Sequence, residues 1–275
     1  MTISKALQIA VAQLRSSCSQ PRFEAELLLG YHLNKERLYL HLHEDKLVED
    51  IEGYQALIAR RKAHEPYEYI TNSASFYDIE LSLSSGVLIP RPETELLVDK
   101  VASIIEREKI QEIVEIGVGS GAISIILARK FPHLKITATD ISQTALNVAS
   151  QNIQKFGLQN QITLLRSNLM DKVTTSPRLV VSNPPYIAND FKLEKNVHNY
   201  EPHTALFGGE IGDELLHKII DNAQNRGVEW LACEMGYDQK ASIEKYLQGV
   251  CIDFSEFYQD FSGFDRGFIA QFSLK

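Results

Sequence analysis

The chain has 275 residues, of which 44% are hydrophobic and 23% are charged. This balance is that of an ordinary globular protein, and it excludes collagen-like and low-complexity chains. The formal net charge of -8 and the pI near 5.5 argue against broad nucleic-acid binding, which usually requires a basic face.

The sequence shows no sign of a membrane, secretory or disulfide-rich protein. No apolar run approaches the roughly 20 residues that a transmembrane helix needs. The first six residues lack the basic-then-apolar layout of a signal peptide. The three cysteines (Cys18, Cys233 and Cys251) are few, odd in number and far apart, so we expect neither a disulfide framework nor a metal site. We therefore expect a cytoplasmic protein with no membrane partner.

Residues 1–66 are expected to form a helical domain. Leu7, Ala10 and Leu14 recur at helical spacing, and Pro21 is a start signal for a second helix. Further helices are expected near residues 35–41 and from residue 48. The last of these ends in three basic residues, 60–62, which favour the negative end of the helix dipole; contact with an acidic partner is the alternative.

Residues 67–90 have a β texture and are expected to form a hairpin that links two domains. Tyr69, Phe76 and Ile79 lie among turn residues such as Asn72-Ser73. The following prolines, Pro90 and Pro92, break the strand, and a helix is expected from there to about residue 106.

Residues 91–275 alternate strand and helix patterns. This order predicts an α/β fold with a doubly wound, mainly parallel sheet. Strands are expected at 113–116, 135–139, 162–165, 179–181 and 228–234. Two more, near 252–258 and 267–272, are expected to pair antiparallel and to complete a seven-stranded sheet.

A glycine-rich loop follows the first of these strands, with the sequence Gly117-Val118-Gly119-Ser120-Gly121. Its G-x-G-x-G spacing differs from the G-x-G-x-x-G of dinucleotide folds. Glu115, near the strand end, would repel a pyrophosphate and attract the ammonium of an amino-acid moiety. The loop therefore favours S-adenosylmethionine over NAD.

Two further polar positions extend the predicted cofactor site. Asp140 ends the second strand, about 20 residues beyond the loop, where an acid accepts hydrogen bonds from ribose hydroxyls. Asn168 follows the third strand and is placed to receive the adenine edge.

The fourth strand runs into Asn183-Pro184-Pro185-Tyr186. Active sites of open α/β sheets gather at the carboxyl ends of such strands. The prolines stiffen the loop and remove backbone donors, Asn183 adds a carbonyl acceptor, and Tyr186 adds a flat ring. This set suits a planar NH₂ group. A plain strand-to-loop turn is the alternative, because Asn and Pro are common in turns.

The long polar segment that follows, residues 187–209, is expected to be a lid or binding loop. It contains Tyr200-Glu201-Pro202 and Gly208-Gly209.

Together these motifs resemble those of class I S-adenosylmethionine-dependent methyltransferases, in which N/D-P-P-Y marks enzymes acting on planar nitrogens. A closer resemblance is to the glutamine-N5 methyltransferases of peptide chain release factors (HemK/PrmC type). It is carried by residues 87–95, by 182–187, by 200–202 with 208–209, and by the helical N-terminus. The resemblance implies methylation of the glutamine in the Gly-Gly-Gln loop of bacterial class 1 release factors, with S-adenosylhomocysteine as the product. It also implies that the N-terminal domain helps to grip the release factor.

Carried over by position, the resemblance assigns a role to each site residue. Asp140 would hold the ribose, Asn168 the adenine region, and Asn183 would contact both cofactor and substrate. The methionine part would lie against Gly117, Val118, Gly119, Ser120 and Gly121. The substrate amide would be held by Asn183, Pro184, Pro185 and Tyr186, of which Asn183, Pro184 and Tyr186 are the expected catalytic residues.

Other functions stay open at this point. A nucleic-acid amine methyltransferase would use the same Asn183 loop on a flipped base, although the acidic pI argues against a stable nucleic-acid partner. A paralogue that methylates a ribosomal protein would look alike in its catalytic half. A nicotinamide oxidoreductase or a non-catalytic binding module fits the glycine spacing less well. We expect a monomer.

Overall fold

The computed structural model describes residues 1–273, and the chain divides into two compact units. The first unit contains Met1–Ser73 together with Leu193–Tyr200. The second contains Ala74–Lys192 and the residues from Glu201 onward. The short segment 193–200 therefore belongs to the first unit, although it lies between two parts of the second in sequence.

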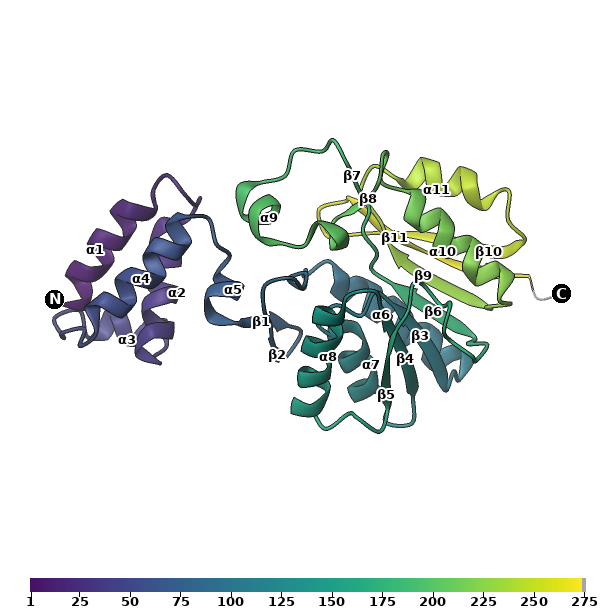
Figure 1. Ribbon diagram of the computed structural model, residues 1–275, viewed down its shortest axis with the longest axis horizontal. Coiled ribbons are helices and arrows are strands. Elements are labelled where there is room, and N and C mark those ends of the chain that lie inside the picture. Colours follow the sequence, from purple (N-terminus) through teal and green to yellow (C-terminus); the bar gives the residue numbers. More distant parts are fainter. Residues whose placement is uncertain (274–275) are drawn as a thin grey trace. The chain divides into compact units, whose positions relative to one another are not determined.

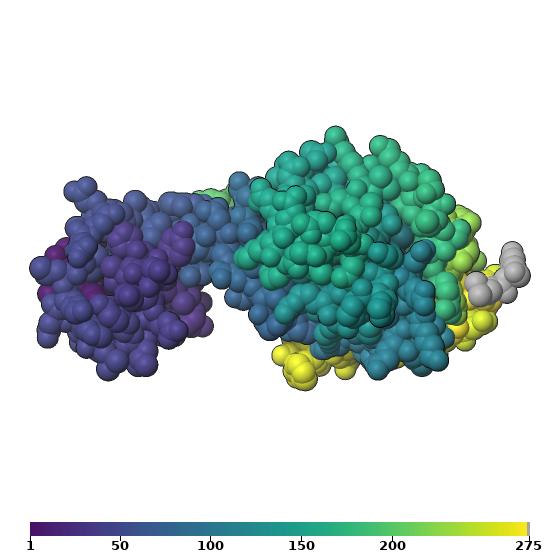
Figure 2. All heavy atoms as spheres, turned by 90° about the horizontal axis from the view of Figure 1, so that it is seen from below, coloured from purple at the N-terminus to yellow at the C-terminus, as the bar shows by residue number. Residues whose placement is uncertain are grey.

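The first unit is helical, as expected, and Figure 2 shows its N-terminal residues gathered in one mass. Leu7, Leu28 and Tyr54 belong to its shared apolar core. The Thr2 side chain caps the first helix by accepting from the Lys5 amide, and Pro21 begins the second. The helices are α1 (Ile3–Leu14), α2 (Pro21–Leu33), α3 (Arg37–Leu42), α4 (Ile51–Lys62), α5 (Tyr67–Thr71) and α9 (Lys195–Tyr200).

Helix α5 occupies residues for which the sequence predicts strand, so that expectation was wrong. Pro66 precedes the helix, and Asn72 ends it with φ of 55° in the left-handed region. Both residues are helix-boundary signals as well as turn signals, and Asn is one of the few residues that adopt this conformation readily. The expected hairpin is consequently shorter, with strands β1 (Ser73–Phe76) and β2 (Ile79–Ser82).

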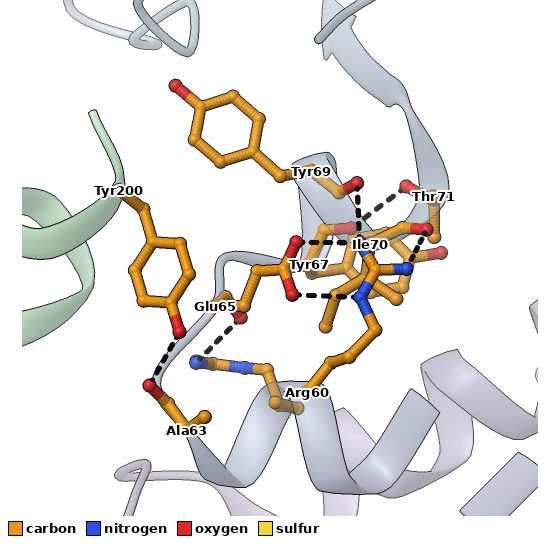
Figure 3. A network of polar contacts seen from close by, with 9 residues as sticks. Arg60, Ala63, Glu65, Tyr67, Tyr69, Ile70, Thr71 and Tyr200 are labelled. Atoms are coloured by element: carbon orange, nitrogen blue, oxygen red, sulfur yellow. Dashed lines mark hydrogen bonds and ion pairs between the residues drawn. The ribbon is translucent and has the colours of Figure 1, made fainter. Parts of the chain in front are cut away.

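Arg60, the first of the three basic residues that end α4, is engaged within the first unit (Figure 3). The Arg60 guanidinium forms an ion pair with Glu65 at 2.6 Å and donates to the backbone carbonyls of Tyr69 and Ile70. The Tyr200 hydroxyl, on α9, donates to the Ala63 carbonyl at 2.9 Å. These contacts join α4, α5 and α9, and they favour a structural role for Arg60 over an external acidic partner.

The second unit contains a seven-stranded sheet in the order β10-β11-β9-β6-β3-β4-β5, which confirms the predicted sheet. All neighbours pair in parallel except those of β11, which runs antiparallel to both β9 and β10. The strands are β3 (Glu112–Ile116), β4 (Lys135–Asp140), β5 (Ile162–Arg166), β6 (Leu179–Ser182), β9 (Trp230–Glu234), β10 (Ile252–Gln259) and β11 (Asp265–Phe272).

Helices cover both faces of this sheet (Figure 1). One face packs against α6 (Thr94–Glu108), α7 (Ala122–Lys130) and α8 (Gln143–Lys155), and the other against α10 (Glu214–Asn225) and α11 (Lys240–Leu247). Successive strand residues point to opposite faces, so Ile113 enters the first core and Val114 the second. With both faces covered, the strand ends are the part of the sheet that remains open to a ligand.

The segment expected to be a lid contains short elements of its own. Strand β7 (Ile187–Ala188) pairs in parallel with β8 (Phe207–Gly209), and the short helix η1 (His203–Ala205) precedes β8. Within residues 1–273, no helix is long and apolar enough to cross a membrane.

Candidate functional site

A cavity of about 180 Å³ opens at the carboxyl ends of the central strands. Ile116, Asp140 and Ser182, the last residues of β3, β4 and β6, line it. After β3 the chain builds the sheet outward through β4 and β5, and then returns to the other side of β3 as β6. This reversal is the topological switch point at which doubly wound sheets bind ligands.

The glycine-rich loop forms one wall of this cavity. Gly117 has φ of 79° and donates its N–H to the Thr139 carbonyl at 2.8 Å, and it lines the cavity together with Gly119. Val118 and Ser120 line a smaller pocket that shares Gly117, Gly119 and Asn183 with the first. Gly121 is not among the described lining residues of the cavity or of the smaller pocket.

Gly121 instead serves the packing of the loop against the neighbouring helices. Its φ is 89°, in the left-handed region where a side chain is strained. A Cβ there would lie 3.2 Å from Ile125 Cδ1 and 3.6 Å from Ala149 Cα. The third glycine therefore lets the start of α7 approach α8.

Asp140 lies between the glycine loop and the cavity. Its Oδ2 accepts from the Gly119 amide at 3.0 Å, and its Oδ1 accepts from the Ser142 amide at 2.8 Å. Burial raises the pKa of Asp140, while these backbone donors act in the opposite direction. Each carboxylate oxygen can accept a further hydrogen bond, so the group can still hold a hydroxylated ligand.

Asn168 lines the cavity at the end of β5, beside Ser167 and Leu169. Its Nδ2 donates weakly to Asp171 at 3.4 Å.

The side chain of Asn183 belongs to a chain of hydrogen bonds that the sequence did not predict. Asn183 Nδ2 donates to Thr94 Oγ1 at 3.0 Å, and Thr94 Oγ1 donates to Glu234 Oε2 at 2.7 Å. The Tyr186 hydroxyl donates to Glu234 Oε1 at 3.0 Å. The single hydroxyl hydrogen of Thr94 goes to the carboxylate, so its oxygen must accept from Asn183. Oδ1 is then the acceptor that Asn183 offers to a ligand.

Glu234 is the buried centre of this chain, with only 2% of its surface exposed. Burial raises its pKa to about 7, although the hydrogen bonds from Thr94 and Tyr186 favour the ionised form. Sequence reasoning missed its role. The available signal was an acidic residue at the carboxyl end of a strand that is otherwise apolar, β9.

The two prolines of the Asn183 loop line the cavity, whereas Tyr186 does not belong to the lining residues described. Tyr186 is held by its hydroxyl, at Glu234, and by its carbonyl, which accepts from Gln239 Nε2 at 2.8 Å. The structure thus brings Asn183, Pro184 and Pro185 to the cavity and anchors the next residue through buried partners.

Gly208, in β8, and Gly212, beyond its end, pack directly against this loop. A Cβ on Gly208 would lie 2.5 Å from the Pro185 carbonyl oxygen and 3.0 Å from Tyr186 Cα. A Cβ on Gly212 would lie 2.5 Å from the Tyr186 carbonyl oxygen. These glycines allow a backbone-to-backbone contact that a larger residue would prevent.

A second buried acid joins two of the motifs identified in the sequence. Glu201 Oε1 pairs with Arg91 Nη2 at 2.5 Å, and its Oε2 accepts from the Ile89 amide at 3.2 Å. The Glu201 side chain is 1% exposed. The segment around Arg91 is therefore tied to the segment that leads into β8.

Glu115 differs in charge from what the sequence suggests. It is completely buried, and the Ser124 hydroxyl donates to its carboxyl group. Burial raises its pKa to about 8, so the neutral form predominates at pH 7. Glu115 therefore does not provide the permanent negative charge that was expected to attract an ammonium group. Within residues 1–273, no cluster of three His, Cys, Asp or Glu side chains could hold a metal ion.

Comparison with known proteins identifies both parts of the chain. Residues 5–71 match the PrmC N-terminal domain, and residues 92–200 match the methyltransferase small domain. The N-terminal domain of human METTL16 in complex with SAH has a similar fold, with a TM-score of 0.52 and 18% identity. That likeness covers 68% of this chain and 73% of the human one, and it shows the fold alone.

Two bacterial relatives are closer in sequence. The release factor glutamine methyltransferase of Koribacter versatilis is 37% identical over 257 residues, which cover 90% of this chain and 91% of the relative. That of Dictyoglomus turgidum is 39% identical over 213 residues, which cover 76% of each chain. With this identity over at least three quarters of each chain compared, the protein belongs to the family of release factor glutamine methyltransferases.

Proposed function

We propose that this protein transfers a methyl group from S-adenosylmethionine to the side-chain nitrogen (N5) of a glutamine in bacterial class 1 release factors, within their Gly-Gly-Gln motif. The observation that carries the proposal is the orientation of Asn183, whose amide oxygen is left free at the cavity by the hydrogen bond from its NH₂ group to Thr94. The family of the chain supports the same substrate.

The cavity suits S-adenosylmethionine. Asp140 keeps acceptor capacity for the ribose hydroxyls, and Asn168 lines the same cavity after β5, where we propose that it contacts the adenine. Gly117 and Gly119 present backbone without side chains to the methionine part, with Val118 and Ser120 in the adjoining pocket. When bound, this cofactor supplies an electrophilic methyl group on a sulfonium.

The substrate amide is a poor nucleophile, because its nitrogen lone pair is delocalised. We propose that Asn183 Oδ1 and the Pro184 carbonyl accept its two N–H hydrogens, and that Pro185 and Tyr186 pack along its plane. These acceptors stabilise the positive charge that develops on nitrogen during attack. Holding the amide in line with the methyl group supplies much of the remaining acceleration. A strong base is not required, because an N-alkylated amide cation loses a proton readily.

The first unit is proposed to contact the release factor. Its match to the PrmC N-terminal domain supports this role. Release factors work on the ribosome, so the proposal places the enzyme in the cytoplasm, where we expect it to act as a monomer.

Methyl transfer from labelled S-adenosylmethionine to purified substrates tests the function. We expect label on a release factor and none on the same factor with the glutamine of its Gly-Gly-Gln motif replaced by alanine. Ribosomal proteins and duplex DNA, offered separately, should stay unlabelled. Label on DNA or on a ribosomal protein, with none on the release factor, would contradict the proposal.

A further inference from the structure

We propose that Glu234 and Thr94 are positioning residues that hold the Asn183 amide with its oxygen toward the substrate, and that a proton on Glu234 releases this orientation. The inference rests on the proposed function of Asn183. It explains why the Asn183 amide oxygen faces the substrate, and it names the protonation of Glu234 as the condition under which the amide reverses.

The argument starts from donors and acceptors. An ionised carboxylate accepts hydrogen bonds and donates none. Glu234 therefore requires a donor from each partner, Thr94 at 2.7 Å and the Tyr186 hydroxyl at 3.0 Å. Once the only hydroxyl hydrogen of Thr94 is committed in this way, Asn183 must present its NH₂ group to Thr94. A charge on one buried residue thus sets the orientation of a side chain two hydrogen bonds away.

Protonation reverses this logic. A neutral carboxyl group carries a hydrogen that it must donate, and Thr94 Oγ1 is one of its two buried partners. If Thr94 accepts that hydrogen, its own hydrogen turns toward Asn183, which then offers Oδ1 to Thr94. The Asn183 NH₂ group would face the substrate NH₂, donor against donor. The geometry of the backbone need not change for the acceptor to be lost.

The surroundings of Glu234 allow this switch near neutrality. Burial raises its pKa to about 7, and the nearby Glu93 acts in the same direction, whereas Arg266 acts against it. The other titratable groups that face it are the hydroxyls of Tyr186 and Tyr258, whose pKa values are raised far above this range. Above pH 7 the carboxylate form predominates, so we expect the productive orientation there and its loss as the pH falls below 7.

Substitutions at Thr94 test the relay without adding or removing a titratable group. Thr94→Val keeps the shape and removes the hydroxyl, so we expect kcat to fall about 10-fold to 100-fold through misplacement of Asn183. The cofactor dissociation constant, measured by calorimetry, should stay unchanged. Thr94→Ser restores the hydroxyl and should restore most of kcat. A role in packing alone would instead leave Thr94→Val close to wild type.

Glu234→Gln tests the proton. In the wild type, kcat should fall about tenfold per pH unit below pH 7, because the active form is the ionised one. The glutamine variant carries no titrating group at position 234, so the fall of kcat below pH 7 (the acid limb of the profile) should vanish. Its kcat at pH 8 should also be lower than that of the wild type. Loss of the limb at constant cofactor affinity separates positioning from a general failure to fold.

Nuclear magnetic resonance reads the orientation without any turnover. The Asn183 side-chain NH₂ signal, assigned by its disappearance in Asn183→Ala, should shift with an apparent pKa of about 7 in the wild type and stay fixed in Glu234→Gln. A signal that does not titrate, or an acid limb that survives in Glu234→Gln, would overturn the inference. If the signal titrates but no release factor is methylated, the proposed function fails and the orientation relay stands.

Discussion

Replacing Gly208 by alanine is the sharpest test of how the substrate loop is held. Gly208 is not among the residues with positive φ, so its backbone accepts an alanine without torsional strain. The new Cβ would nevertheless lie 2.5 Å from the Pro185 carbonyl oxygen, 3.0 Å from Tyr186 Cα and close to the Gly212 carbonyl. All of these are backbone atoms, so no side chain can rotate away.

The size of the effect follows from those distances. An ordinary contact needs 3.4 Å or more, so the loop must move by about 1 Å to admit the methyl group. A misplacement of that size in a near-attack geometry costs about 100-fold in rate, equivalent to about 3 kcal/mol of transition-state stabilisation. We therefore expect Gly208→Ala to lower kcat for release factor methylation about 100-fold.

The assay combines single-turnover methyl transfer with calorimetric binding of S-adenosylmethionine and a thermal melt. Gly249→Ala is the matched control, because its Cβ would meet the Tyr246 carbonyl oxygen at an ordinary 3.4 Å. Cofactor binding should be close to wild type in both variants, and the melt shows how far Gly208→Ala destabilises the fold as a whole. Equal turnover by Gly208→Ala and Gly249→Ala would refute the idea that strand β8 fixes the Asn183 loop.

Four more substitutions follow from the site and the fold. Asn183→Ala should retain cofactor binding in calorimetry but lose about 10²–10³ in kcat, as when one preorganised polar partner is removed; near-normal methyl transfer would contradict its role. Asp140→Ala should weaken cofactor binding, and an unchanged dissociation constant would exclude the ribose contact. Glu24→Ala removes the carboxylate that accepts two hydrogen bonds from Arg61, which is 8% exposed, and should cost about 3 kcal/mol in urea unfolding. Asp78→Ala, in an exposed pair with Arg129, should lower the urea midpoint far less than Glu24→Ala does.

The sequence was sufficient for the parts of the fold that depend on local pattern. Apolar strands alternating with amphipathic helices predicted the doubly wound sheet, and the final pair was expected to run antiparallel. Strand ends also fixed the positions of Gly117, Asp140 and Asn183, because parallel strands bring their carboxyl ends to one edge. That all three line one cavity follows from this rule.

The hydrogen-bond chain behind Asn183 could not be predicted in the same way. Thr94 and Glu234 are 140 positions apart in sequence, and they meet only because α6 packs beside β9. In the sequence Thr94 looks like a residue of a helix start, and Glu234 looks like the end of a buried strand. Neither local pattern carries information about the other. The contact between Thr94 and Glu234 could therefore be found only from the three-dimensional order of the sheet.

Local ambiguity explains the error at α5. Pro66 and Asn72 mark the boundaries of a helix and are also residues of turns. Tyr69 and Ile70 between them are as common in strands as in short helices, and five residues are too few for a period to be recognised. The helix exists because Tyr69 and Ile70 are buried in the fold, which is tertiary information.

The two prolines make the distant partners necessary. Pro184 and Pro185 have no backbone N–H, so their part of the loop cannot be held by donating to a neighbouring strand. The loop must be fixed through its carbonyl oxygens, its side chains and steric contact. The structure supplies one of each: Gln239 donates to the Tyr186 carbonyl, Glu234 accepts from the Tyr186 hydroxyl, and Gly208 packs against the Pro185 backbone. An Asn-Pro-Pro-Tyr sequence without such supports would still form a turn, but its carbonyl acceptors would be free to move. An amide nitrogen needs these acceptors fixed in place before it can attack the methyl group.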